Sequence, residues 1–369
     1  MKKLYVRVAF LILVLSLSVS LNANTSMMGQ PPLPQLAANK TPAIKIDPRT
    51  GRHKVTFSVL IYNIAGLPWP IKSGRGERLD LIAEEFARMR EKGTAPDLVL
   101  LQEAFMDQSR DIIFAGGYEN YITGPATEDI VEGASAAAPQ EFIAARNPWR
   151  GETWGKVINS GLYIMSKFPI VEEYETAFPR QDCAGWDCLA NKGVMMAGIR
   201  IPGVPFLIDV ANTHMNSKGP SSGVDLHRTT AAQRLQVDTI HTLLNRTDHT
   251  GRPLIMAGDF NLKGLPEMVD YFRRGRDSRR VGLLARQYCL DPGNGCDVRM
   301  PLESNTPWLD TNDLQAFHGG DRVRLRPLRV EVLFDEKVGD EPLSDHDGYL
   351  VHYELSWHPD DFPTQIAGL

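Results

Sequence analysis

Short apolar runs bounded by turn-forming residues recur along most of this 369-residue chain, and they restrict its fold more than any other feature. Most runs are about four to eight residues long, contain many β-branched side chains and end at Gly, Pro, Asn or Asp, which is typical of buried strands. The expected strands are Val55–Tyr62, Leu98–Leu101, Gly161–Met165, Val194–Ile201, Phe206–Ala211, Leu254–Ala257, Leu328–Phe334 and Tyr349–Leu355.

Two longer segments have the spacing of amphipathic helices. Glu77–Lys92 places Leu79, Ile82 and Phe86 on one face, and His227–Asn245 repeats the pattern. Helices and strands mix without strict alternation, and several strands follow one another directly. We therefore predict an α/β chain of the α+β type, built as a sheet sandwich, and not a doubly wound parallel sheet.

The first 23 residues have the pattern of a secretory signal peptide. Three basic residues precede an apolar run from Val8 to about Val19, and Ala23 offers a small residue for cleavage. The run is short for a membrane span, so an uncleaved anchor is the less favoured alternative. We expect residues 1–23 to be removed and the chain to be secreted or periplasmic.

The rest of the chain is expected to form one large domain. Residues 24–50 are rich in Pro, Asn, Thr and Ala, which predicts a linker. A globular pattern without an internal repeat follows over residues 51–358, and residues 359–369 are expected to be a C-terminal tail.

The composition is that of a folded, acidic protein. Hydrophobic residues make up 43% and charged residues 23% of the chain, which excludes a disordered or polytopic membrane protein. The formal net charge is −5, and it becomes −8 when the three basic residues of the predicted signal peptide are removed. Such a protein is a poor candidate for binding long nucleic acid by charge alone.

The four cysteines form two local pairs in the sequence, Cys183 with Cys188 and Cys289 with Cys296. An exported chain meets an oxidising compartment, so disulfides are expected. Three pairings are open, of which the two local bonds are the simplest. Zinc is disfavoured because neither spacing is CxxC and no His pair is nearby.

Polar residues able to do chemistry stand at the ends of five expected strands. They are Asn63, Glu103, His214, Asp259 with Asn261, and Asp345 with His346. Each one alone is explained as a turn former. Five together predict a shared rim, where loop residues from several strands converge.

These residues offer oxygen ligands and imidazoles but no thiolate. Carboxylates and amides suit Mg²⁺, with Mn²⁺ or another divalent cation as alternatives, and two histidines suit proton transfer near neutral pH. A metal, a general base and a phosphate-binding amide together indicate hydrolysis of a phosphate ester. The sequence contains no GxSxG, Walker lysine loop, HExxH or dinucleotide fingerprint.

Five motifs in this order resemble those of the endonuclease/exonuclease/phosphatase superfamily. They are Tyr62–Pro68 (YNIAGLP), Leu101–Glu103 (LQE), Asn212–His214 (NTH), Gly258–Asn261 (GDFN) and Leu343–His346 (LSDH). The resemblance spans residues 55 to 355. It implies a deoxyribonuclease I-like fold: a four-layered sandwich of two packed mixed β-sheets flanked by helices, with a metal site at one sheet edge.

The resemblance also implies which residues hold the metal. Glu103 would be the primary ligand and Asn63 its neighbour, while Asp345 would lie beside the metal or support the adjacent histidine. Mg²⁺ is the expected cofactor.

In the same resemblance, His346 would be the general base that activates water for attack on phosphorus. Asp313 falls where the family places the acid that orients this base, although the residues after it depart from the family pattern, and Asp310 is its rival. Asp259 would position the water or assist the leaving group.

The remaining residues would contact the phosphate. Asn261 would hold a phosphoryl oxygen, and His214 would stabilise charge on phosphorus or protonate the departing alkoxide. Lys192, in a segment similar to one in sphingomyelinases, would place a point charge on the phosphate. The alternative for Lys192 is a solvated lysine in a turn.

Export, net acidity and the segment around Lys192 favour a sphingomyelinase-like phosphodiesterase, with a lipid head group rather than nucleic acid as the partner. We expect a monomer, and Trp69, Trp149 and Trp154 are candidates for peripheral membrane contact, although tryptophans are more often packing residues. The protruding aromatic hairpin of secreted bacterial sphingomyelinases is not recognisable here, which argues against efficient attack on intact bilayers.

Two alternatives remain. Basic stretches at Arg273–Arg280 and Arg322–Arg329 would suit a secreted nuclease, although a charge run is usually a solvated face. A catalytically inactive binding module of the same fold is disfavoured because every motif residue is present.

Overall fold

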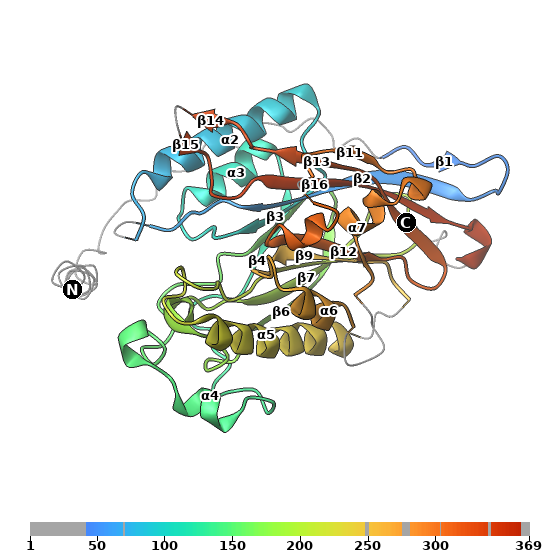
Figure 1. The fold of residues 1–369 in the computed structure, drawn as a ribbon. Coiled ribbons are helices and arrows are strands. Elements are labelled where there is room, and N and C mark those ends of the chain that lie inside the picture. Colours follow the sequence, from blue (N-terminus) through green and yellow to red (C-terminus); the bar gives the residue numbers. More distant parts are fainter. Residues whose placement is uncertain are drawn as a thin grey trace.

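The computed structural model describes residues 42–68, 71–247, 251–274, 281–302, 304–338 and 341–362. The predicted signal peptide 1–23, most of the predicted linker, Trp69, and residues 363–369 of the predicted tail lie outside these ranges. Two packed β-sheets form the centre of the molecule, and helices cover their outer faces (Figure 1). The predicted four-layered sandwich is therefore confirmed.

The first sheet has eight strands in the order β11-β13-β16-β2-β3-β5-β4, with β1 paired to β2. Their bounds are β1 Lys45–Ile46, β2 His53–Asn63, β3 Leu98–Gln102, β4 Asn120–Thr123, β5 Tyr163–Ser166, β11 Asp297–Arg299, β13 Val323–Leu333 and β16 Gly348–Trp357.

The second sheet has six strands in the order β10-β12-β9-β8-β7-β6. They are β6 Ile170–Ala177, β7 Gly193–Ile199, β8 Ile208–His214, β9 Leu254–Asp259, β10 Leu283–Leu284 and β12 Asp313–His318. A separate hairpin joins β14 Lys337–Val338 to β15 Glu341–Pro342.

The α-helices are α2 Arg75–Lys92, α3 Ser109–Gly116, α4 Gln140–Ala144, α5 Leu226–Arg246, α6 Pro266–Arg274 and α7 Ala285–Leu290. Short 3₁₀ helices are η2 Pro148–Arg150, η3 Gly185–Leu189, η4 Pro292–Asn294, η5 Pro307–Leu309 and η6 Pro359–Asp361. Among the described residues, no helix is both long and apolar enough to cross a membrane.

Alternation along the strands explains the layers. One set of side chains from β2 and β3, including Val59, Ile61 and Leu100, faces the second sheet and packs with residues such as Val210 and Ile255. The opposite set faces outwards under helices, because successive side chains of a strand point to opposite faces. Central strands that are buried on both faces have continuous apolar sequences, and this made them recognisable in the sequence.

The helices cover the outer faces with the apolar stripes that the sequence predicted. Helix α2 buries Leu79, Ile82 and Phe86 against the first sheet, and α5 buries apolar residues such as Val237 and Ile240 against the second. Helix α2 ends at Gly93, whose left-handed backbone lets its N–H bond the carbonyls of the last turn. In α5, the side chain of Asp225 caps the first turn by accepting from the N–H of Arg228.

The parallel strand pairs bring the predicted rim together. Strand β2 runs parallel to β3, and β8 runs parallel to β9 with His214 opposite Asp259. The antiparallel partner β12 starts beside the end of β9, so Asp313 is also opposite Asp259. The carboxyl ends of both parallel pairs therefore meet at one edge of the sandwich.

The structure adds features that the sequence did not predict. Strand β6 is half-exposed and rich in Glu, and the predicted strand Leu328–Phe334 begins earlier, at Val323, with a register shift between Pro327 and Arg329. In the predicted linker, Lys45–Ile46 pairs with β2. Both local disulfides, Cys183–Cys188 and Cys289–Cys296, are confirmed.

Candidate active site

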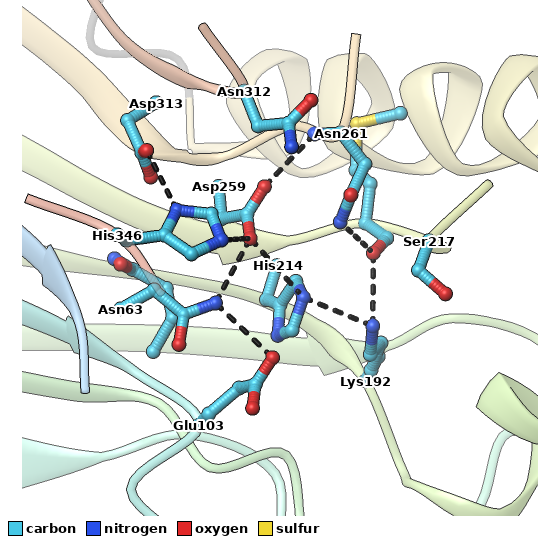
Figure 2. A network of polar contacts seen from close by, with 12 residues as sticks. Asn63, Glu103, Lys192, His214, Ser217, Asp259, Asn261, Asn312, Asp313 and His346 are labelled. Atoms are coloured by element: carbon cyan, nitrogen blue, oxygen red, sulfur yellow. Dashed lines mark hydrogen bonds and ion pairs between the residues drawn. The ribbon is translucent and has the colours of Figure 1, made fainter. Parts of the chain in front are cut away.

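The polar residues at the strand ends converge on one small buried cluster. Asn63 ends β2, Glu103 follows β3, His214 ends β8 and Asp259 ends β9, while Asp313 begins β12. Figure 2 shows these side chains pointing toward one another, together with His346. The predicted rim is thus a single site.

His346 lies between two carboxylates. Its Nδ1 is 2.7 Å from Oδ2 of Asp313, and its Nε2 is 3.7 Å from Oδ2 of Asp259 (Figure 2). Burial favours the neutral imidazole, but the nearby carboxylates, Asp313 above all, outweigh it and raise the pKa of His346 to about 10. Asp310 instead accepts a hydrogen bond from Ser304, so Asp313 and not its rival lies against His346.

Asn63 connects the carboxylates of the two sheets. Its side-chain NH₂ donates to Oε1 of Glu103 at 3.1 Å and to Oδ2 of Asp259 at 2.9 Å, while its Oδ1 accepts from the N–H of Ala65. The three acids Glu103, Asp259 and Asp313 therefore lie around one amide and one imidazole.

The backbone at this edge is strained, as is common at functional sites. Glu103 has φ 54° and Asn261 has φ 55°, both in the left-handed region that side-chain-bearing residues rarely adopt. The N–H of Gly66 donates to the carbonyl oxygen of Glu103 at 2.9 Å. A Cβ on Gly66 would lie only 2.6 Å from the same oxygen. The glycine of the YNIAGLP motif is therefore required by close backbone approach.

His214 is buried in contact with a cation. Its Nε2 is 3.0 Å from Nζ of Lys192 and 3.5 Å from Oδ2 of Asp259. Burial, Lys192 and His346 hold the pKa of His214 well below its usual range, so this imidazole is neutral at pH 7. Because the lysine ammonium can only donate, Nε2 accepts and the proton is assigned to Nδ1, which has no hydrogen-bond partner among the described residues.

Lys192 is only 6% exposed and is therefore not a solvated turn lysine. Its ammonium forms an ion pair with Asp187 and donates to the carbonyl of Met215 at 3.0 Å. Asp187 also accepts from Ser217. The lysine thus lies within the site, beside His214.

Asp259 and Asn261 form a compact turn after β9. The N–H of Asn261 donates to Oδ1 of Asp259 at 3.0 Å, and its side-chain NH₂ donates to the carbonyl of Met215 at 3.2 Å. Burial raises the pKa of Asp259, the charge of His346 opposes this and Asp313 adds to it, so that the net pKa is about 6. This carboxyl group can therefore exchange a proton near neutral pH.

The donor set suits a divalent cation. Asp259, Asp313 and His346 each offer one ligand atom, and these atoms lie within 4.8 Å of one another. Oδ1 of Asp313 is buried without a hydrogen-bond partner in the described structure, which leaves a hard oxygen donor available.

Of the predicted metal residues, Glu103 and Asn63 join this network and Asp345 does not. The Asp345 side chain is 61% exposed and pairs with Lys72 at 2.9 Å. Its pKa lies below the usual range: burial raises it, but the hydrogen bond and charge of Lys72 outweigh that effect.

Three motif residues without a predicted role hold the site together. The amide of Gln102 donates to Asn212 at 2.7 Å, and this buried bond joins the two sheets directly beneath the site. Ser344 donates to the carbonyl oxygen of Asn63 at 2.6 Å, which fixes the loop that carries His346. Their place inside the LQE, NTH and LSDH motifs was the available signal.

The chain belongs to the Endonuclease/Exonuclease/phosphatase family, whose model matches residues 60–346. It is 26% identical over 178 residues to Sphingomyelinase C 2 of Leptospira interrogans. That match covers 47% of this chain but only 26% of the relative, so the chain spans about a quarter of that protein's length.

Several solved structures share the fold. Beta toxin from Staphylococcus aureus superposes with a TM-score of 0.55 at 17% identity, covering 80% of this chain and 99% of the toxin. Sphingomyelinase C from Streptomyces griseocarneus gives 0.54 at 19% identity, covering 80% and 99% of the two chains. TDP2 of D. rerio, in a humanized form, gives 0.52 at 13% identity, covering 81% and 98%. At these identities the likeness establishes the deoxyribonuclease I-like fold alone.

Proposed function

We propose that the chain is a divalent-metal-dependent phosphodiesterase that hydrolyses a choline-bearing lipid, with sphingomyelin as the expected substrate. The observation that carries this proposal is the placement of His346 between Asp313 and Asp259, across from the neutral His214. The similarity to sphingomyelinases of two bacteria supports the choice of lipid.

In this proposal His346 is the general base. Asp313 fixes its Nδ1 proton, which leaves Nε2 to take a proton from the attacking water. A bound divalent cation would stabilise the charge that grows on the phosphate and offset the carboxylate charges that raise the pKa of His346. Mg²⁺ is the expected ion, and a related beta toxin structure was solved with bound magnesium ions.

The other residues complete the reaction. Neutral His214 donates a hydrogen bond to a phosphoryl oxygen and does not act as the acid, because a neutral imidazole is a poor proton donor. Asp259, with a pKa near 6, assists the leaving alkoxide, and Asn261 contacts the phosphate. Hydrolysis would break the bond between phosphorus and the ceramide oxygen and release phosphocholine.

Binding of the metal is assigned to the carboxylate of Glu103, beside the side chain of Asn63. Its oxygens match the preference of Mg²⁺ for hard ligands. Lys192 and His214 then lie on the opposite side of Asp259, where the phosphate would be held.

Export is part of the same proposal. A signal peptide at residues 1–23 and two disulfides fit a secreted or periplasmic protein that acts as a monomer. The alternative of a nuclease is weakened in part of the second basic stretch, where Arg326 pairs with Glu354 and Arg329 pairs with Glu331. Residues 275–280 of the first basic stretch lie outside the described residues.

A substrate panel tests the proposal. Sphingomyelin and phosphatidylinositol phosphates in detergent micelles, double-stranded DNA and RNA would each be incubated with Mg²⁺ or with EDTA. We expect release of phosphocholine from sphingomyelin only with Mg²⁺. Cleavage of DNA or RNA without release of phosphocholine would replace the lipid substrate by nucleic acid.

A further inference from the structure

The segment between β4 and β5 forms a lobe outside the sandwich. Residues 126–157, here called the α4 lobe, contain α4 and η2 and protrude beyond the second sheet (Figure 1). Trp149, in η2, is 78% exposed, and Trp154 and Val157 are 41% and 46% exposed. Exposed apolar side chains that gather on one part of a surface mark an interaction site, whereas single ones are normal.

The α4 lobe is held rigidly despite its exposed surface. Glu152 is buried and accepts two hydrogen bonds from the guanidinium of Arg228 in α5, at 2.7 and 2.8 Å. The same carboxylate accepts from the N–H groups of Gly185 and Asn147. Trp149 is therefore displayed on a fixed base.

Trp154 connects the lobe to the proposed active site. Its ring meets Trp186 edge-on at 6.2 Å, and Trp186 precedes Asp187, the ion-pair partner of Lys192. The α4 lobe therefore contacts the segment that holds Lys192 in the site.

The chemistry of this surface fits a bilayer better than a protein partner. Tryptophan favours the interface between lipid head groups and acyl chains. A stable protein interface needs about 20–30 residues on each side, far more than the few apolar side chains exposed here. Charge attraction is not the driving force, because acidic Glu128, Glu132 and Glu141 are exposed in the same lobe.

We propose that the α4 lobe, through Trp149 and Trp154, docks the protein on a zwitterionic lipid bilayer and presents the neighbouring active site to the head groups. The inference rests on the proposed function, since it supplies the surface on which a lipid-cleaving site would work. Because insertion of aromatic rings is apolar, binding should depend little on salt.

Co-sedimentation with vesicles tests the docking surface directly. Wild-type protein would be mixed with large unilamellar vesicles of phosphatidylcholine and sphingomyelin in EDTA, at low and high salt. We expect Trp149→Ala to weaken vesicle binding by about tenfold, the scale of losing one buried aromatic side chain. The control Phe114→Ala removes an exposed aromatic from α3 and should bind as the wild type does.

Activity assays separate failure of docking from failure of the proposed function. Trp149→Ala should lose activity on vesicles and keep wild-type activity on soluble bis-p-nitrophenyl phosphate. Wild-type-like vesicle binding by Trp149→Ala, no binding by the wild type, or binding abolished by salt would overturn the docking surface. If Trp149→Ala loses vesicle binding but the wild type cleaves no phosphodiester, the docking surface is upheld and the proposed function is rejected.

Discussion

The buried ion pair between Glu152 and Arg228 makes a quantitative prediction about stability. Glu152 is 1% exposed, and its two oxygens accept four hydrogen bonds, two of them from Arg228 and two from backbone N–H groups. Glu152→Gln removes the charge and turns one acceptor into a donor that faces other donors. Breaking one partner of a buried pair costs about 3–5 kcal/mol, because the remaining charge stays buried without compensation.

The matched control is Glu132→Gln. Glu132 lies in the same α4 lobe and pairs with Arg180, but its side chain is 69% exposed. An exposed pair contributes about 0–1 kcal/mol. Urea denaturation would give both free energies of unfolding, and hydrogen exchange of the lobe amides would show whether the loss is local. If Glu152→Gln is destabilised no more than Glu132→Gln, the burial argument is wrong.

Three further predictions concern the site. In EDTA, the raised pKa of His346 stabilises the folded state fully below its ordinary 6.5, and this contribution is lost as pH rises through about 10. The wild type should therefore lose its advantage in free energy of unfolding over His346→Asn between pH 7 and 10, by at most about 1.4 kcal/mol per pH unit. Urea titrations at each pH would measure this difference, and a constant difference would refute the prediction. Asp313→Asn should lower turnover by about 10²–10⁴-fold. It should also shift to lower pH the rise in the pH–rate profile that reports deprotonation of the general base, whereas Asp310→Asn should change neither. Glu103→Gln should weaken Mg²⁺ binding, measured calorimetrically, by at least about tenfold, and unchanged affinity would remove Glu103 from the metal site.

Periodicity predicted the parts of the fold that are buried on both sides. Strand β3 (Leu98–Gln102) is continuous apolar sequence, and α2 carries its stripe of apolar residues at helical spacing. Strand β6 escaped prediction because its exposed face alternates with Glu and no longer resembles a buried run. The short, half-exposed β4 escaped for the same reason.

The candidate site was predicted in residues but not in geometry. The motifs named Asn63 and His214, which end strands of the two parallel pairs, and His346, which reaches them through Asp313. They could not show that Lys192 would be buried against His214, because that contact depends on the pairing of β7 with β8. They also could not show that Asp345 would pair with Lys72, since the partner lies far away in the chain.

The docking surface was the least predictable feature. A tryptophan in a sequence is more often packed than exposed, and only the fold shows that Trp149 projects from a rigid lobe. The buried support of that lobe, Glu152, also has no local signature, because its partner Arg228 lies in a different helix.

One measurement tests the central claim, that the strand ends form a single metal-dependent phosphodiester site. Turnover of bis-p-nitrophenyl phosphate would be compared for the wild type and for folded His346→Ala, each with Mg²⁺ and with EDTA. The account predicts activity only for the wild type with Mg²⁺, and a loss of at least about 10²-fold in the variant. Equal turnover in the two proteins, or full activity of the wild type in EDTA, would contradict it.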